Sequence, residues 1–81
     1  MTDSEIAAKI EQLVAEEHQL AAPASDDEEA ERDRHARLEA VKVELDRCWD
    51  LLRQRRAREE FGEDPDAARE RPVSDVEGYL Q

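Results

Sequence analysis

A chain of 81 residues with a net charge of −11 allows one small domain at most, and it excludes a large buried core. Only 15 residues are Leu, Ile, Val or Phe, a share typical of disordered chains, so a folded part must be inferred from regular apolar spacing. The single cysteine excludes an internal disulfide, and no apolar run approaches the ~18 residues of a membrane span. The N-terminus "MTDSEIAAKIEQ" does not resemble a signal peptide, so we expect a cytoplasmic protein without membrane contact.

The first predicted element is a helix over residues 3–21. Thr2 or Ser4 can cap its N-terminus, and Pro23 ends it. The residues of one helix face recur at spacings of four and three, as in a coiled coil. They are Ile6, Ile10, Leu13, Glu17 and Leu20.

A short turn at residues 22–25 leads into a longer helix predicted over residues 26–60. Ser25 and Glu28 have the spacing of a capping box, and Gly62 suits the C-terminal cap. The apolar face of this helix repeats the spacing of three and four along Leu38, Val41, Leu45, Cys48, Leu52 and Arg55. Two helices with matching faces and a short connection predict an all-α fold, an antiparallel two-helix hairpin, coiled-coil-like, over residues 1–60.

The unequal lengths of the two helices predict an overhang. With the turn centred near Pro23, Ile6 is expected opposite Val41 or Lys42, so residues 47–60 would project past Met1 by roughly 21 Å. Burial of each large apolar side chain on that overhang is worth ~1.5–3 kcal/mol, which favours an antiparallel homodimer through residues 45–56. The expected interaction residues are Leu45, Cys48, Trp49, Leu52, Arg53, Arg55 and Arg56.

Residues 61–81 are predicted to form a turn-rich, partly ordered C-terminal tail. Asp64 precedes Pro65 at a possible helix start, so "PDAARER" is expected to make a short helical segment that Pro72 ends. Two alternatives stay open for the rest: it covers Trp49, in cis or in trans, or it is a disordered docking peptide. The tail residues expected to cover Trp49 are Phe61, Val76 and Tyr79.

Residue types that carry catalysis or bind metals are present but not grouped. Cys48 has no Cys or His at ligand spacing and lies on the apolar face, so we expect a small buried hydrophobe. His18 and His35 have no metal-site spacing and are expected to face solvent. The sequence contains no glycine-rich phosphate loop and no nucleophile motif. We therefore predict no catalytic, cofactor-binding or metal-binding residue, no cofactor and no enzymatic activity.

Charge is unevenly distributed along the chain. Residues 1–31 carry a net charge of −9, residues 32–60 a net +2 and residues 61–81 a net −4. The basic run "RQRRAR", Arg53 to Arg58, is the best candidate for phosphate contacts. The overall acidity and the lack of interleaved aromatic residues argue against nucleic acid, and Asp50 is placed to pair with Arg53. We expect these arginines to pair with protein carboxylates, including those of the acidic first helix, and not to bind nucleic acid directly.

The stretch "CWDLLRQRR" at residues 48–56, together with "IEQLVAEEHQL" before it and the ending "VEGYLQ", resembles a family of short actinobacterial proteins classified as a domain of unknown function. The resemblance covers nearly the whole chain. It implies a small, cytosolic, mostly helical protein, and it supplies no activity or catalytic residue to carry over.

Two classes of function remain. The first is a non-enzymatic helical protein–protein interaction module that self-associates and presents its acidic surface or C-terminal peptide to an unidentified protein partner. The alternative is an acidic-tipped coiled-coil regulator of a nucleic-acid machine such as RNA polymerase. The segment "DDEEA" at residues 26–30 is loosely similar to the acidic tips of factors that enter the polymerase secondary channel. The first helix, at about 29 Å, is short for that task.

Overall fold

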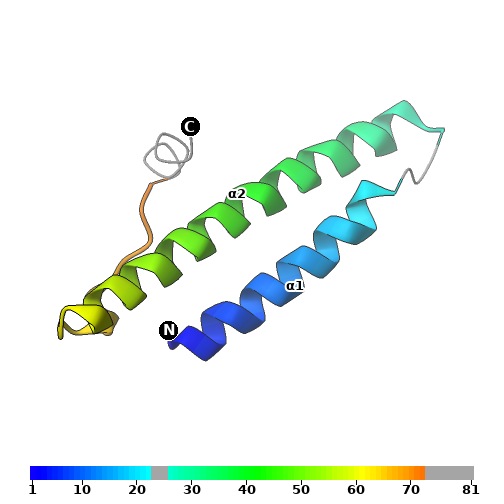
Figure 1. Cartoon of the computed structure of the whole chain (residues 1–81). Coiled ribbons are helices and arrows are strands. Elements are labelled where there is room, and N and C mark those ends of the chain that lie inside the picture. The colour runs from blue at the N-terminus through cyan, green and yellow to red at the C-terminus, as the bar shows by residue number, and fades with distance from the viewer. Residues whose placement is uncertain (23–25, 73–81) are drawn as a thin grey trace.

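The computed structural model describes residues 1–22 and 26–72 and confirms an all-α helical hairpin. Helix α1 spans Asp3–Ala21, helix α2 spans Glu28–Glu60, and a single 3₁₀ turn, η1, spans Pro65–Ala67. The two long helices run antiparallel and side by side, and α2 extends past α1 at both ends (Figure 1). The described part of the chain contains no strand.

Thr2 starts α1 through a complete capping box. Its hydroxyl accepts a hydrogen bond from the Glu5 amide at 3.2 Å, and its own amide donates to the Glu5 carboxylate at 2.9 Å. These two bonds satisfy backbone groups that the first helical turn leaves unpaired. The contacts with Thr2 also favour the charged form of the Glu5 carboxyl and therefore lower its pKa.

The start of α2 differs from the prediction. The helix begins at Glu28 and not at residue 26, and its N-cap is Asp27, whose carboxylate accepts from the Glu29 amide at 3.0 Å. Ser25, the predicted cap, lies outside the described residues. Asp27 lies two residues after Ser25, and an aspartate caps a helix as well as a serine. The later start lengthens the connection between the helices.

Gly62 ends α2, as predicted. Its φ of +73° is a left-handed conformation that a side chain would strain. This turn directs the Gly62 amide to the Glu59 carbonyl at 3.2 Å and the Glu63 amide to the Arg58 carbonyl at 2.7 Å. The two bonds form a Schellman motif, which pairs carbonyls that the helix end would leave open and turns the chain back along α2.

The core lies between α1 and one face of α2, with one contribution from beyond η1. Ile6 and Val41 are fully buried at its centre. The other buried apolar residues are Ile10, Leu13, Leu45, Cys48, Leu51, Leu52 and Ala68. The spacing of three and four therefore identified most of both packed faces correctly, whereas Leu38, expected on the packed face of α2, is only half-buried and lies outside the core.

The register of the hairpin differs from the prediction. Glu16 pairs with Arg37 at 2.6 Å and Lys9 with Glu44 at 3.5 Å, so α1 lies further along α2 than a tight turn at Pro23 implies. Residues 28–33 run past the end of α1 before the helices meet (Figure 1). The predicted overhang of residues 47–60 is therefore wrong, because the first turn of α1 reaches the level of Arg55.

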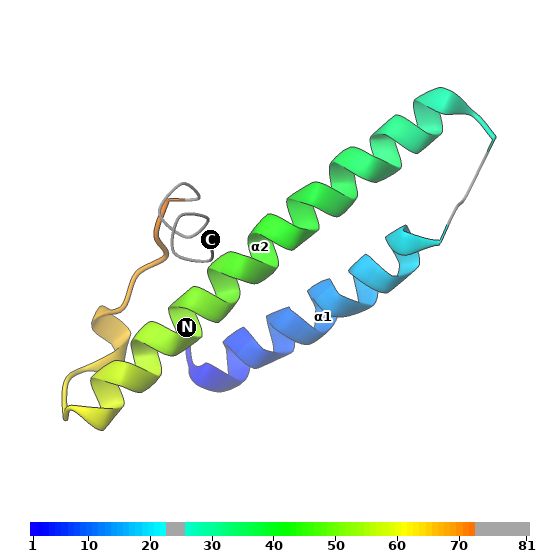
Figure 2. The same ribbon diagram turned by 45° about the horizontal axis from the view of Figure 1, so that its top comes forward.

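Residues 63–72, here called the strap, run back along α2 after Gly62. Asp64 caps η1 by accepting from the Asp66 amide at 2.9 Å, at the predicted helix start, but only one 3₁₀ turn forms. Ala68 then packs into the core. Figures 1 and 2 both show the strap on the side of α2 away from α1. The strap thus covers a second face of α2.

Candidate functional site

Arg55 joins three segments of the chain. Its Nε donates to Asp3 at 2.6 Å, and its Nη1 donates to the Asp66 carboxylate at 2.9 Å and to the Pro65 carbonyl at 3.2 Å. Only 6% of Arg55 is exposed. The hydrogen bonds to Asp3 and Asp66 raise the pKa of the guanidinium, and the same contact lowers the pKa of Asp66. The predicted pairing of the basic run with acidic α1 is confirmed at Arg55. Its guanidinium is thus already bonded to carboxylates of its own chain.

Three more of the predicted interaction residues lie inside the hairpin. Leu45, Cys48 and Leu52 are buried, with Cys48 only 2% exposed, as expected of a small buried hydrophobe. Burial raises the pKa of the Cys48 thiol. These side chains are covered by the same chain because α1 extends further along α2 than the sequence indicated. They do not form a surface that a second molecule can reach.

Trp49 is a large apolar residue in the middle of the hairpin that remains half-exposed. Its side chain is 45% exposed on a face of α2 that lies outside the buried core. Residues at helical spacing before and after it share that face, are exposed or half-exposed, and include the remaining two predicted interaction residues. We call this set the open face: His35, Leu38, Lys42, Trp49, Arg53 and Arg56.

The strap is attached to α2 by charged groups that the sequence did not identify. Asp50 is only 3% exposed, and its carboxylate pairs with Arg71 at 3.3 Å and accepts from Gln54 at 2.9 Å. The sequence placed Asp50 beside Arg53 instead. Gln54 also donates to the Arg69 carbonyl at 2.7 Å. Asp50 and Gln54 lie on the side of α2 opposite the packed face. Polar residues are common at such helix positions, so the sequence alone did not indicate that the strap would cover these two.

The acidic tip, residues 26–33, lies beyond the end of α1. It carries six acidic residues and one arginine. Arg34 marks the level at which α1 ends, because its guanidinium donates to the Leu20 carbonyl and pairs with Glu31 at 2.8 Å. The start of α2 therefore projects past the end of α1, as Figures 1 and 2 show. The acidic residues of the tip are exposed except for Glu31, which is half-buried.

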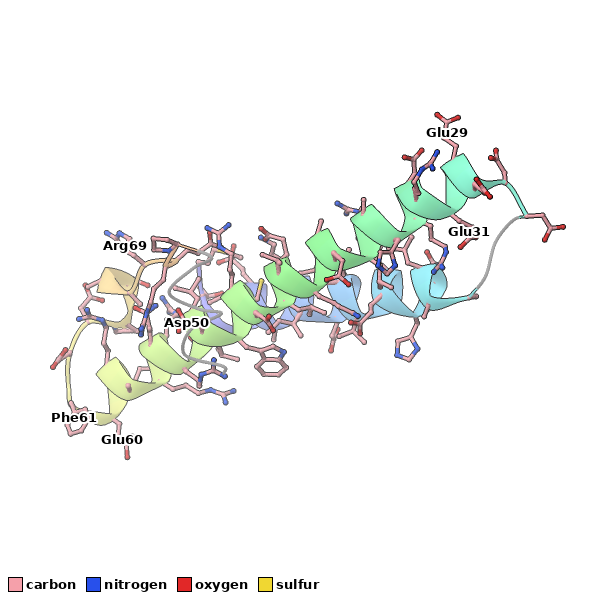
Figure 3. All side chains as sticks on the ribbon, turned by 90° about the horizontal axis from the view of Figure 1, so that it is seen from above. Glu29, Glu31, Asp50, Glu60, Phe61 and Arg69 are labelled. Carbon is pink, nitrogen blue, oxygen red and sulfur yellow. The ribbon has the colours of Figure 1, made fainter. Side chains whose placement is uncertain are left out.

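The other residues considered from the sequence lie at the surface. His18 and His35 are exposed, as expected, and residues 1–22 and 26–72 contain no group of three potential metal ligands. Phe61 is 79% exposed at the end of α2 and does not cover Trp49 (Figure 3). Val76 and Tyr79 lie outside the described residues. Within the described ranges, no helix is both long enough and apolar enough to cross a membrane.

A two-helix hairpin with a strap along its longer helix, and a half-exposed tryptophan followed by two arginines on one face, defines a small all-α protein. The chain belongs to the DUF2630 family, described as "Protein of unknown function (DUF2630)", whose model matches residues 2–81. It is 49% identical over 78 residues to the uncharacterized protein Rv0898c of Mycobacterium tuberculosis strain H37Rv and to the uncharacterized protein Mb0922c of Mycobacterium bovis. Each match covers 96% of this chain and 90% of the relative. No solved structure matches the chain.

Proposed function

We propose that this chain is a non-enzymatic, cytosolic protein–protein interaction module that associates with a second copy of itself. The half-exposed Trp49 carries this proposal. Tryptophan and arginine are enriched at the centres of protein interfaces, where a large aromatic side chain becomes fully desolvated. Here Trp49 is followed on the open face by Arg53 and Arg56.

The buried charged groups support a structural role for the rest of the chain. Asp50 and Arg55 are the buried charged residues of the described part, and each has partners from the strap. A catalytic acid, base or nucleophile needs a group with free access to substrate. These two groups instead hold the strap and α1 in place.

Sedimentation equilibrium on the wild type and on Trp49→Ala tests this function. We expect a wild-type dimer at tens of micromolar and a shift toward monomer in Trp49→Ala. Phe61→Ala is the matched control, because it removes an exposed aromatic side chain away from the open face. A monomeric wild type, or an unchanged dimer in Trp49→Ala, contradicts the proposal.

The basic run supplies a second test of the same function. Arg55 and Arg58 pair with carboxylates of this chain, Arg58 with Glu63 at 3.3 Å. We expect no appreciable binding to duplex or single-stranded nucleic acid at physiological salt, where non-specific binders commonly reach ~10⁻⁴ to 10⁻⁶ M. Micromolar binding in a fluorescence-anisotropy titration, weakening steeply with salt, would assign Arg53 and Arg56 to phosphates instead.

The projecting acidic tip favours one second candidate, a regulator that inserts this tip into a nucleic-acid machine such as RNA polymerase. The tip extends past α1 by about six residues, or ~9 Å. Binding of the wild type to purified RNA polymerase, lost on replacing Asp26 and Asp27 by lysine, supports this candidate. Self-association without polymerase binding supports the first.

A further inference from the structure

We propose that two copies of this chain pack antiparallel along the length of α2, with the acidic tip of each copy against Arg53 and Arg56 of the other. This inference rests on the proposed function and names the surface through which self-association occurs. The proposed interface between the two copies covers the whole open face and the acidic tip, and not only the neighbourhood of Trp49.

The charges of α2 are separated along its length. The acidic tip carries a net charge of −5, whereas residues 53–58 contain four arginines and no acid. Parallel pairing of two α2 helices would place like charges together at both ends. Antiparallel pairing places opposite charges together at both ends, and a two-fold axis makes the two contacts identical.

Helical spacing extends the open face into the tip. Glu28 and Glu31 precede His35 at the same steps of three and four residues. With the two-fold axis at Lys42, Glu31 lies eleven residues before the axis and Arg53 eleven after it. Likewise Glu28 lies fourteen residues before the axis, and Arg56 lies fourteen after it. Each glutamate therefore faces an arginine of the second copy.

The same register gives Trp49 a partner surface. His35 lies seven residues before Lys42 and Trp49 seven after it, so the indole of the second copy faces His35, one turn from Leu38. A hollow of about 210 Å³ borders this position. It is lined by Glu17, His18, Ala21, Leu38 and Lys42. An aromatic side chain can lie over the imidazole and fill the apolar side of this hollow.

The unfavourable element is Lys42, which meets its own copy at the axis. Its side chain is exposed, and its ammonium lies 3.8 Å from Glu39. A long exposed lysine can keep this pairing and direct its charge into water beside the interface. The contact between the two lysines therefore does not determine how the two α2 helices are oriented. The opposite-charge contacts at their two ends determine it.

Glu28 and Arg56 form the pair best suited to a test. Neither makes an ion pair within residues 1–22 and 26–72, whereas Glu31 is bonded to Arg34. Glu29 supplies a matched control: it lies in the same helical turn as Glu28, and Figure 3 shows it on the opposite side of α2 from Glu31. A change to arginine disturbs the helix start similarly at residues 28 and 29.

The experiment is a charge exchange followed by sedimentation equilibrium. Glu28→Arg and Arg56→Glu should each weaken the dimer roughly tenfold, because each opposes like charges at two symmetric exposed contacts. An equimolar mixture of the two variants should regain wild-type affinity as a heterodimer, since both contacts again pair opposite charges. Glu29→Arg should dimerise normally, and it should restore Arg56→Glu no further than wild type does, because one of the two contacts in that mixed dimer still pairs like charges. The dimer should also weaken with added salt.

The outcomes separate this inference from the function on which it rests. A monomeric wild type overturns both. A wild-type dimer that neither substitution weakens, or that the mixture fails to restore, overturns the antiparallel α2 contact and leaves self-association through another surface. Circular dichroism of each variant shows whether the helices are intact, and recovery in the mixture cannot come from unfolded chains.

Discussion

Asp3 and Arg55 lie 52 positions apart in the sequence and are joined by a 2.6 Å hydrogen bond between Oδ1 and Nε. This contact brings the first turn of α1 against the last third of α2. The same guanidinium holds Asp66 and the Pro65 carbonyl, so one side chain sets the positions of both the N-terminal helix and the strap.

Loss of the Arg55 guanidinium should therefore loosen both segments at once. In Arg55→Gln we expect the thermal midpoint to fall by about 5–10 °C, because two carboxylates lose their shared partner and the strap its anchor. Hydrogen exchange should accelerate at residues 66–68. Arg56→Gln is the adjacent exposed control and should melt near the wild-type temperature at concentrations where the chain is monomeric. Equal losses in both variants would contradict a specific role for Arg55.

Stability should decrease in acid partly through Asp66. Arg55 holds the pKa of Asp66 below its ordinary value of 3.8, so the contact stabilises the fold above that pH. This contribution is lost as the pH falls through the lower pKa of the folded state. The difference in thermal midpoint between wild type and Asp66→Asn should therefore be largest near neutral pH and should shrink as the pH falls below 3.8. A difference independent of pH would exclude the ion pair as its source.

The centre of the core should tolerate truncation poorly. Ile6→Ala removes a side chain that is 1% exposed and leaves a cavity in the core between α1 and α2. We expect the free energy of unfolding in urea to fall by about 2–5 kcal/mol. Phe61→Ala removes a larger side chain from the surface and should change it by less than about 0.5 kcal/mol.

At Gly62, we expect the backbone conformation alone to determine how well a substitution is tolerated. No atom lies within 4 Å of where a Cβ would stand, so space does not limit substitution. The positive φ does, and Gly62→Ala should cost about 1–2 kcal/mol of stability. Gly62→Asn should cost less, because asparagine adopts this conformation more readily. Urea denaturation of the three proteins gives the order.

Cys48 should be chemically protected. Burial raises its thiol pKa, so little thiolate forms at neutral pH, and the side chain is covered by the hairpin. We expect reaction with a thiol reagent to be slow in the native protein and fast in urea. Rapid modification under native conditions would indicate that α1 separates readily from α2.

Local sequence patterns determined much of the fold. The spacing of Ile6, Ile10 and Leu13 identified the buried face of α1, because the geometry of one helix fixes which side chains share a face. The same argument identified Val41 and Cys48 on α2. Caps depend on a few adjacent residues, which is why Thr2 was one of two predicted N-caps of α1 and why Gly62 was assigned correctly.

The candidate site could be predicted only in part. The sequence drew attention to Trp49, Arg53 and Arg56, and the structure places them together on the open face. The sequence could not distinguish these exposed residues from the buried Cys48 and Arg55. All five lie in one segment of α2, and the sequence of that segment does not show which side α1 covers. That distinction required the register of the hairpin.

Tertiary contacts alone decided the register and the strap. Helical periodicity is unchanged when one helix slides along another by a full repeat, so it leaves the offset between α1 and α2 undetermined. Contacts such as Arg34 with Leu20 and Arg55 with Asp3 select one offset, and they join residues distant in sequence. Asp50 is buried for a similar reason: its burial depends on Arg71 returning from the strap, and no local pattern encodes that return.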